Sequence, residues 1–533
     1  MKYAKSVGPP GTGKTTYLLK QIERDCDRYF HRKIGAVSLT TAAVSEIRGR
    51  IARHLDIKKE DAENVRTIHS HCYKLLNMRK DGVAETSANI KKFNQMWPQL
   101  AINGGGGDDI TEYAAAKHHN QQAFNDMQNY RNRMIPVDSW KNPLAVKMND
   151  AWTSFMNEND LTDFTGMLER ALSISEAPDM DVIYIDECQD TSVLAMNVLM
   201  KWAAGTQKAV FIGDTDQALF RFSGAVPEVF GNLKTDWSSS LKQSYRVPEK
   251  VHEFAMKIIR KIPGRADVEY IPYNEHAYNM INESGGNAPQ WYKGAVFKTA
   301  KPDLTLPGTH MILGRTNRTV HKYVAELRHK AIPFHNPYRP DDNTWNPSNQ
   351  SAWRVAVIYH KLTECRDITV NELKALARDC IAKQCFTKKG VKKQISEMPD
   401  NKEMITFFDL MSLGFSENFT DKKIPPEQCL NIKSKSADMI FSILKNAPEK
   451  LYDSPNVILG TIHSVKGGEA DHVWIDCEMS YPIMKALKTR QPPYAFADEC
   501  RCFYVAATRA RQTVGIMNHS ANPILRGIRF KFH

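Results

Sequence analysis

The chain has 533 residues, enough for about three or four domains with buried cores. Hydrophobic residues make up 42% and charged residues 25%, which are globular proportions and exclude a largely disordered or membrane-like composition. Lysine and arginine outnumber aspartate and glutamate by 72 to 60, and the resulting net charge of +12 favours an anionic partner such as nucleic acid.

The chain begins with a strand-like segment that runs into glycines, without the apolar region and cleavage site of a signal peptide. No apolar stretch is long enough to form a transmembrane segment. The ten cysteines lack the regular spacing of a disulfide framework. We therefore expect a cytoplasmic protein that does not bind membranes. We also expect the chain to be a monomer in isolation.

The first motif is the segment Gly8–Thr15, GPPGTGKT, which fits the phosphate-loop pattern. It follows a predicted strand, Tyr3–Val7, and precedes a predicted helix, Thr16–Arg24. In such a loop the backbone N–H groups surround the phosphates, Lys14 neutralises the β and γ oxygens, and the Thr15 hydroxyl ligates Mg²⁺. The predicted nucleotide-binding residues of this segment are Gly8, Pro9, Pro10, Gly11, Thr12, Gly13, Lys14, Thr15 and Thr16.

Short apolar runs farther along the chain predict buried parallel strands separated by helices, and hence an α/β fold. The strands cluster at residues 1–70 and 180–245 and again at 305–335 and 455–533, which leaves two mostly helical stretches between them. The predicted strands are Ile34–Leu39, Val182–Ile185, Ala209–Ile212, Met311–Leu313, Val457–Leu459, Val473–Ile475 and Val514–Met517.

This distribution predicts two α/β domains, each interrupted by a helical insertion. The first domain comprises residues 1–71 and 179–240, and its insertion comprises 72–178. The second domain comprises residues 241–335 and 453–533, and its insertion comprises 336–452.

The apolar strand Val182–Ile185 ends in two carboxylates, Asp186 and Glu187. In a phosphate-loop sheet this is the position of the magnesium ligand and of the catalytic base. We expect Asp186 to hold the metal, and Glu187 to orient or deprotonate the attacking water.

The segment after this strand, DECQDT, resembles a signature of superfamily 1 helicases of the UvrD, Rep and PcrA type. Five further segments resemble motifs of that family in the family's order. They are Thr67–Ser70 (motif Ib), Gly213–Ala225 (motif III), Leu241–Arg246 (motif IV), Thr461–Glu469 (motif V) and Asp498–Ala510 (motif VI).

The resemblance implies two RecA-like domains and an ATP-dependent DNA helicase that moves along single-stranded DNA in the 3′-to-5′ direction. It assigns Gln189 and Gln217 to sensing the γ-phosphate or positioning water, Tyr245 to stacking on the base and Glu469 to the ribose. Arginines of the second domain would stabilise the transition-state charge. The predicted catalytic set is Lys14, Glu187, Gln217, Arg246 and Arg509.

On the DNA side, the resemblance implies that Phe220 and Phe222 stack against bases, each contact contributing roughly 1–3 kcal/mol. The other predicted DNA-binding residues are Thr40, His69, Arg315 and His463. The expected partners are single-stranded DNA, junctions of single- and double-stranded DNA, and proteins of replication or repair. Ser223 replaces a usual arginine and Gly468 a larger apolar residue, and both changes weaken the predicted grip on DNA.

Other interpretations stay open. The chain fits an ATPase that translocates on single-stranded DNA, or displaces proteins from it, without strong unwinding. A non-catalytic nucleic-acid-binding module with a vestigial nucleotide site, or a phosphate-loop kinase, fits the residues less well. The insertions are shorter than in the larger bacterial members of the family that the motifs resemble, which suggests a compact or a virus-encoded version. For a virus-encoded protein the cytoplasm would be that of the host.

Overall fold

The structure is a computed structural model that describes residues 2–38, 41–54, 56–58, 62–79, 81–103, 119–283, 290–340, 342–399, 404–420 and 424–528. The chain divides into two compact units. Unit 1 comprises Met1–Lys301, Arg315–Asn317 and Asp471–His533, and unit 2 comprises Pro302–Gly314 and Arg318–Ala470. Within the described ranges, no helix has both the length and the apolar character needed to cross a membrane.

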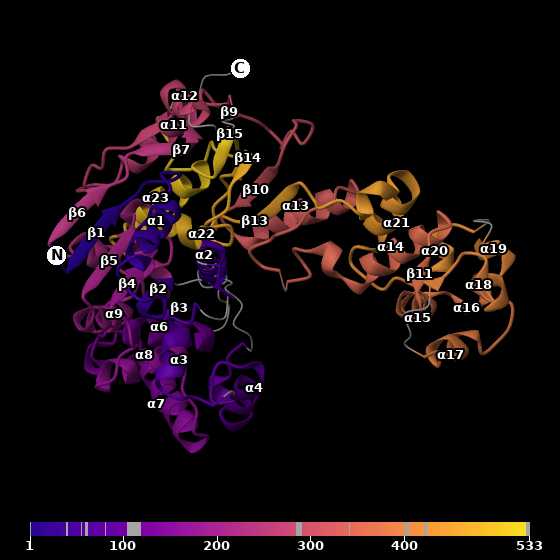
Figure 1. Cartoon of the computed structure of the whole chain (residues 1–533), viewed down its shortest axis with the longest axis horizontal. Coiled ribbons are helices and arrows are strands. Elements are labelled where there is room, and N and C mark those ends of the chain that lie inside the picture. The colour runs from indigo at the N-terminus through magenta and orange to yellow at the C-terminus, as the bar shows by residue number, and fades with distance from the viewer. Residues whose placement is uncertain are drawn as a thin grey trace. The chain divides into compact units, whose positions relative to one another are not determined.

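The first sheet of unit 1 has six parallel strands in the order β3-β2-β4-β5-β1-β6 (Figure 1). Because parallel strands end at the same edge, the loop after β1 and the acidic residues after β4 lie on one edge of the sheet. The strands are β1 (Tyr3–Val7), β2 (Ile34–Ser38), β3 (Val65–Thr67), β4 (Val182–Ile185), β5 (Lys208–Gly213) and β6 (Trp237–Ser240).

Helices cover both faces of this sheet, which is why its central strands are apolar throughout. On one face Tyr184 of β4 belongs to the same buried cluster as Leu18 of α1. On the other face Ile183 of β4 clusters with Trp202 of α9. The helices of this core are α1 (Lys14–Cys26), α2 (Thr41–His54), α3 (Ile68–Leu75), α9 (Val193–Gly205) and α10 (Pro227–Gly231).

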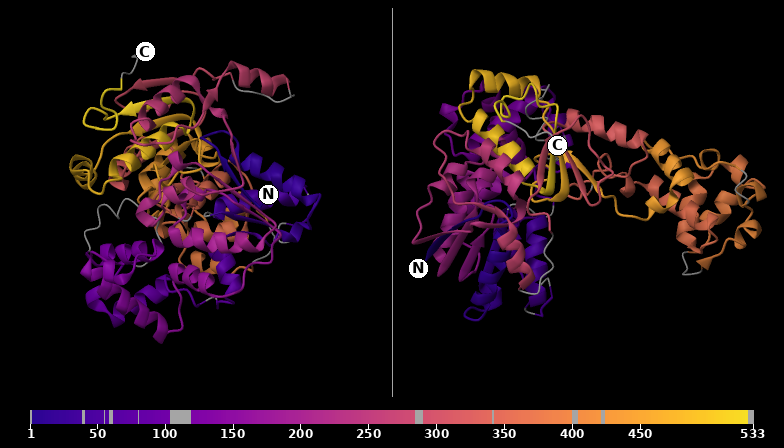
Figure 2. Two further views of the ribbon diagram at one scale, coloured as in Figure 1. Left: turned by 90° about the vertical axis from the view of Figure 1, so that its left-hand side faces the viewer. Right: turned by 90° about the horizontal axis from the view of Figure 1, so that it is seen from above.

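The helices of residues 81–173 have a buried core of their own. The ring of Trp152 is 5.0 Å from that of Phe93 and 5.0 Å from that of Phe124. Helices α6, α7 and α8 form one group below the first sheet in Figure 1 and in the left view of Figure 2. The helices are α4 (Ser87–Met96), α6 (His119–Asn132), α7 (Pro143–Glu158) and α8 (Phe164–Ser173).

The remainder of unit 1 is a second α/β layer. Strand β7 (Gln243–Pro248) pairs in parallel with β8 (Ile271–Tyr273), and β15 (Ala510–Met517) pairs in parallel with β9 (Ala295–Lys298). The helix that follows β7 packs against the helix that precedes β15. The other elements are β14 (Ala470–Asp476), α11 (Glu249–Ile259), α12 (Glu275–Glu283), α22 (Tyr481–Thr489) and α23 (Ala495–Ala507).

Unit 2 is mainly helical and contains a parallel pair of strands, β10 (His310–Gly314) and β13 (Val457–Thr461). A second, antiparallel pair is formed by β11 (Ile368–Thr369) and β12 (Met404–Ile405). The helices are α13 (Asn317–His329), α14 (Ser351–Thr363), α15 (Val370–Asp379), α16 (Ala382–Cys385), α17 (Val391–Ser396), α18 (Asp409–Ser412), α19 (Glu417–Thr420), α20 (Pro426–Cys429) and α21 (Ala437–Asn446).

The predicted α/β class is confirmed, and every predicted apolar strand coincides with an observed one. Strand β2 is described to Ser38, and Leu39 lies outside the described residues. The strands that the sequence did not predict are short or polar. Strand β6, for example, has the sequence WSSS and lies at an edge of its sheet, where a strand needs no apolar run.

Candidate functional site

The phosphate loop joins the end of β1 to the start of α1. Its first residue, Gly8, donates its amide to the carbonyl of Gly213 at 3.1 Å, and the Thr12 hydroxyl donates to the carbonyl of Pro9 at 2.8 Å. Gly13, which precedes α1, has a φ of 76°, in the left-handed region that glycine readily adopts. The loop therefore ends at a helix N-terminus, whose free amides favour a phosphate group.

Lys14, the first residue of α1, folds over this loop. Its amino group donates to the carbonyl of Gly8 at 2.8 Å. A Cβ on Gly8 would lie 2.5 Å from Cγ of the lysine, so a larger residue there would displace the lysine side chain. Burial lowers the pKa of the Lys14 amine, while the carboxylates of Glu187, Asp214 and Asp186 act in the opposite direction. The lysine is therefore within electrostatic reach of three acidic groups.

Asp186 and Glu187 directly follow β4. Asp186 is buried, and its Oδ1 accepts the amide of Glu187 at 2.9 Å. Glu187 has a φ of 55°, a conformation that costs a residue other than glycine roughly 1–3 kcal/mol. Its carboxylate accepts a hydrogen bond from the side chain of Gln189, which in turn accepts the amide of Asp214 at 2.9 Å. The two acids thus form one network with the end of β5.

Gln217, in the short helix η6 (Thr215–Gln217), links this network to an arginine. Its Nε2 lies 2.7 Å from Oδ2 of Asp214 and 3.4 Å from the carbonyl oxygen of Gly8. Its Oε1 accepts a hydrogen bond from Nη2 of Arg509 at 3.3 Å, and Arg509 is only 3% exposed. The structure thus joins three of the predicted catalytic residues, Lys14, Gln217 and Arg509, through the carbonyl of Gly8.

Strand β7 packs directly against the phosphate loop. The amide of Tyr245 donates to the carbonyl of Gly11 at 2.8 Å. A Cβ on Gly11 would lie 2.7 Å from Cβ of Arg246, and the φ of Gly11 is 75°. The side chain of Tyr245 is 47% exposed. The predicted base-stacking and arginine residues of motif IV therefore both border the loop.

Two residues that the sequence analysis missed hold the loop at Pro10. The hydroxyls of Ser244 and Tyr270 both donate to the carbonyl of Pro10, at 3.0 and 2.8 Å. Burial raises the pKa of Tyr270, which keeps the phenol neutral and able to donate. Ser244 lies within the quoted motif IV, but no sequence signal marks Tyr270.

A third missed residue, Arg265, forms a buried salt bridge beside Gln217. Its Nε and Nη2 both lie 2.8 Å from Oδ2 of Asp216. Asp216 donates its amide to Oδ1 of Asp214 at 3.0 Å. Burial, and then the neighbouring Asp216, raise the pKa of Asp214 to about 6. Arg265 therefore neutralises the charge of Asp216, one of the two neighbouring buried acids, Asp214 and Asp216, in motif III.

Phe220 directly precedes the short helix η7 (Arg221–Ser223), which follows this network, and Phe222 lies within it. Their ring centroids are 6.0 Å apart in an edge-to-face arrangement, and both side chains are half-buried. Arg221 between them is buried and forms ion pairs with Asp498 at 3.2 Å and Glu228 at 2.6 Å. The two predicted stacking rings are thus carried on a turn that is fixed by charge.

The other predicted DNA-binding residues of unit 1 have different surroundings. The ring of His69 lies 5.3 Å from that of Phe164, and burial lowers the pKa of His69 to about 4, so the imidazole is neutral at physiological pH. Arg315 forms a two-pronged salt bridge with Glu499, at 2.6 and 2.9 Å. The guanidinium group of Arg315 thus binds a carboxylate of the same chain, and its contact with DNA stays a prediction. Thr40 lies outside the described residues.

Unit 2 contains the predicted motif V residues. His463 is buried after β13, and Glu469 is half-buried before β14. A Cβ on Gly468 would lie 2.4 Å from the hydroxyl oxygen of Tyr338. This explains the small residue at a position where a larger apolar side chain was expected. The roles assigned to His463 and Glu469 stay predictions.

Thr15 and Asp186 are the predicted magnesium ligands. A hydroxyl and a carboxylate supply the hard oxygen donors that Mg²⁺ prefers. Thr15 is half-buried in the first turn of α1, and Asp186 is 4% exposed at the carboxyl end of β4. Because β1 and β4 both run parallel to β5 in one sheet, the phosphate loop and Asp186 lie at the same edge of that sheet. The donor set therefore fits the metal.

The phosphate loop after the first strand, the acids after β4 and the arginine near Gly8 define a phosphate-loop nucleotide-binding protein of the α/β class. Comparison with protein families identifies it further. Residues 7–238 match the UvrD/REP helicase N-terminal domain, and residues 357–521 match the UvrD-like helicase C-terminal domain. The chain belongs to the UvrD/Rep helicase family.

Individual relatives are distant. ATP-dependent DNA helicase PcrA of Leuconostoc citreum is 23% identical over 278 residues, which cover 47% of this chain and 36% of the relative. ATP-dependent DNA helicase Rep of Buchnera aphidicola subsp. Schizaphis graminum is 21% identical over 282 residues, 47% of this chain and 41% of the relative. The match to YjcD of Bacillus subtilis (strain 168) is 22% identical over 558 residues and covers 89% of this chain and 71% of YjcD. The chain thus spans less than half the length of the first two relatives.

Proposed function

We propose that this chain is an ATP-dependent DNA helicase that translocates on single-stranded DNA in the 3′-to-5′ direction and couples ATP hydrolysis to strand separation. The observation that carries the proposal is the hydrogen-bonded path from Arg509 through Gln217 to the carbonyl of Gly8, at 3.3 and 3.4 Å. A cationic side chain at that position can respond to the γ-phosphate and balance the charge that develops in phosphoryl transfer.

In this proposal the acidic pair and the arginines have separate roles. Glu187 orients the attacking water and accepts its proton, and Gln189 fixes the direction of that carboxylate through their hydrogen bond. Arg246 and Arg509 stabilise the transition state. Thr15 and Asp186 would hold Mg²⁺, which when bound neutralises charge on the phosphate oxygens.

The DNA track is proposed to lie along the turn that carries Phe220 and Phe222. Half-buried aromatic rings can offer a face to a base without reading its identity, so little base specificity is expected. The same motif III segment contains Gln217, so a shift of the turn caused by DNA would reach the nucleotide site through a few residues. This short path supports hydrolysis that is stimulated by DNA.

The catalytic assignment is tested with the variants Glu187→Gln and Lys14→Ala. Glu187→Gln should lose about 10²–10⁴-fold in DNA-stimulated ATP turnover, as expected when a general base is removed, and should still bind oligo-dT. Lys14→Ala should also lose turnover because the phosphate charge is no longer neutralised. The matched control is Glu158→Gln, at an exposed residue that ends α7. Substantial DNA-stimulated turnover in Glu187→Gln would contradict the assignment.

Direction and unwinding need a second experiment, with duplexes that carry a 3′ DNA tail, a 5′ DNA tail or a 3′ RNA tail. Strand separation only from the 3′ DNA tail is expected. Translocation on a single strand without strand separation would favour the protein-displacing ATPase. If no nucleic acid stimulates phosphate release, the motor proposal fails and the non-catalytic module is favoured.

A further inference from the structure

The helices of residues 119–173 have no role in the proposed mechanism, yet one of them contacts the turn of the proposed DNA track. The side-chain amide of Asn129 in α6 donates to the carbonyl of Phe222 at 3.2 Å. Nη2 of Arg133, directly after α6, donates to the carbonyl of Arg221 at 3.2 Å. Both bonds end on main-chain oxygens, so they fix the backbone of the turn rather than one side chain.

The turn also approaches α6 as closely as its backbone permits. Gly224, which ends the turn, has a φ of 98°, and a Cβ built on it would lie 2.7 Å from Cβ of Asn132. Asn129, Asn132 and Arg133 are three and four residues apart, so they lie on one face of the helix. One face of α6 therefore matches the turn in both hydrogen bonding and shape.

Arg133 reaches beyond the turn to the segment before α23. The guanidinium carbons of Arg133 and Arg221 lie 5.8 and 4.9 Å from the ring centroid of Tyr494. Arg221 also pairs with Asp498 in α23, the helix that ends two residues before Arg509. The insertion, the turn and the motif VI helix thus meet around one tyrosine ring.

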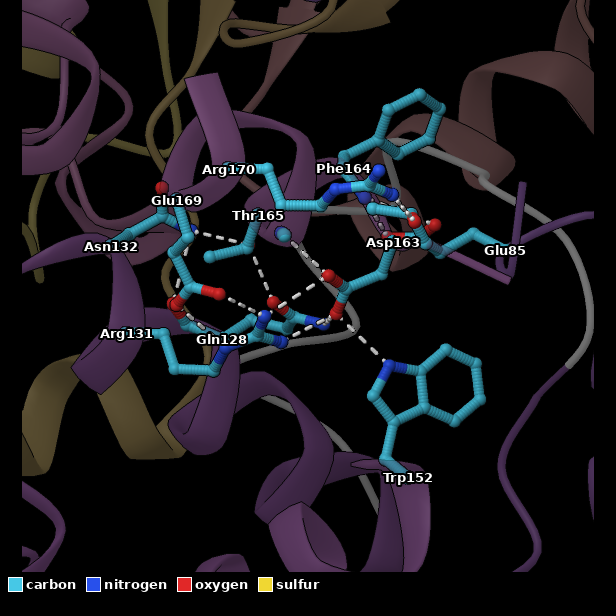
Figure 3. Close-up of polar contacts among 12 residues, drawn as sticks. Glu85, Gln128, Arg131, Asn132, Trp152, Asp163, Phe164, Thr165, Glu169 and Arg170 are labelled. Carbon is cyan, nitrogen blue, oxygen red and sulfur yellow. Dashed lines mark hydrogen bonds and ion pairs between the residues drawn. The ribbon is translucent and has the colours of Figure 1, made fainter. Parts of the chain in front are cut away.

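A different face of α6 is fixed within the insertion by a buried carboxylate (Figure 3). Asp163, at the start of α8, is fully buried and accepts hydrogen bonds from Arg131, Gln128 and Trp152, at 3.1, 2.9 and 2.9 Å for the Nη2, Nε2 and Nε1 donors. The Asp163 carboxylate also accepts the amide of Gly166 and so caps the N-terminus of α8. Helix α6 is therefore a rigid support for what it contacts.

We propose that α6 is a brace that presets the turn Phe220–Gly224 for DNA, and that Asn129 and Arg133 are positioning residues for DNA-stimulated ATP hydrolysis. This proposal rests on the proposed function and assigns a role to the helical insertion that contains α6. Holding the turn in its DNA-binding conformation spares the ordering cost of binding. The contact of Arg133 with Tyr494 carries a change at the turn to α23.

The test compares Asn129→Ala and Arg133→Ala with the wild-type chain in ATP turnover as a function of oligo-dT concentration. Each variant should need about two- to tenfold more DNA for half-maximal stimulation, the loss expected for one hydrogen bond. Turnover without DNA should stay unchanged. Arg133→Lys, which keeps a donor, should recover part of the loss. The matched control is Gln122→Ala, because Gln122 lies in the same helix and its side-chain amide donates to Asp126 of that helix at 2.8 Å.

A double-variant cycle with Phe222→Ala separates positioning from general loss of stability. If Asn129 acts through the turn, Asn129→Ala should change half-maximal stimulation less than twofold in the Phe222→Ala background. Equal changes in both backgrounds, or no change in the wild-type background, would overturn the brace while leaving the proposed function intact. A wild-type chain without any DNA stimulation would overturn both.

Amide hydrogen exchange without DNA supplies a readout that is independent of turnover. Asn129→Ala and Arg133→Ala should accelerate exchange of the amides of residues 220–226, and Gln122→Ala should not. Unchanged exchange in that segment would show that α6 does not hold the turn, and would overturn the proposal even if turnover changed.

Discussion

The contact between the phosphate loop and β7 can be tested with two glycines of the loop, which share a backbone conformation but differ in how close they lie to β7. Gly11 and Gly13 have nearly the same left-handed backbone, with φ of 75° and 76°. A Cβ on Gly11 would lie 2.7 Å from both Cβ of Arg246 and Oγ of Ser244, whereas a Cβ on Gly13 would meet nothing closer than 3.8 Å. Alanine at each position therefore separates backbone strain from the overlap with β7.

The expected magnitudes follow from these distances. Alanine in the left-handed region costs about 1–2 kcal/mol at either position. Only Gly11→Ala must also displace β7, because Cβ of Arg246 is anchored to the backbone and cannot swing away. Such overpacking typically adds about 1–3 kcal/mol. Gly11→Ala should thus be destabilised by about 2–5 kcal/mol, against about 1–2 kcal/mol for Gly13→Ala.

The two variants are compared by thermal unfolding and by hydrogen exchange of residues 241–248. In a large domain each kcal/mol lowers the midpoint by about 2–4 °C, so Gly11→Ala should unfold several degrees below Gly13→Ala. Exchange in β7 should accelerate in Gly11→Ala alone. Equal midpoints and equal exchange in the two variants would refute the packing of β7 on the loop, and with it the position of Arg246.

Two further predictions concern buried charges. Burial, and to a smaller extent the charge of Asp163, raises the pKa of Glu85 from 4.5 to about 8. The neutral carboxyl should therefore contribute its full stability below about pH 4.5. As the pH rises from there to about 8, the free energy of unfolding should fall by up to about 1.4 kcal/mol per pH unit. Glu85→Gln, which keeps an acceptor for the amide of Phe164, should flatten the dependence of the melting temperature on pH. If the variant and the wild-type chain show the same dependence on pH, the raised pKa of Glu85 is disproved. Arg265→Ala leaves Asp216 buried and unpaired, and should cost about 3–5 kcal/mol in urea unfolding. Adding Asp216→Asn should restore most of that loss, and a double variant as unstable as Arg265→Ala would argue against the buried pair.

Consecutive residues were sufficient to predict the phosphate loop and the acidic pair. A glycine-rich segment between an apolar strand and a helix has few alternative conformations, and the observed β1, the loop and α1 follow the predicted order. The apolar runs of β4 and β5 predicted central strands because both faces of that sheet are covered by helices. The edge strand β6 was not predicted, because it has no apolar run and its serines are exposed or half-buried.

The residues that surround the loop were decided by tertiary structure alone. Tyr270 reaches Pro10 across 260 positions of the chain, and Arg315 pairs with Glu499 across 184. No periodicity or local spacing records such contacts, because they arise only when distant elements pack together. The sequence by itself therefore determined the chemistry at the ends of the central strands. Packing determined which side chains hold the loop, and it placed Arg315 in a salt bridge with Glu499.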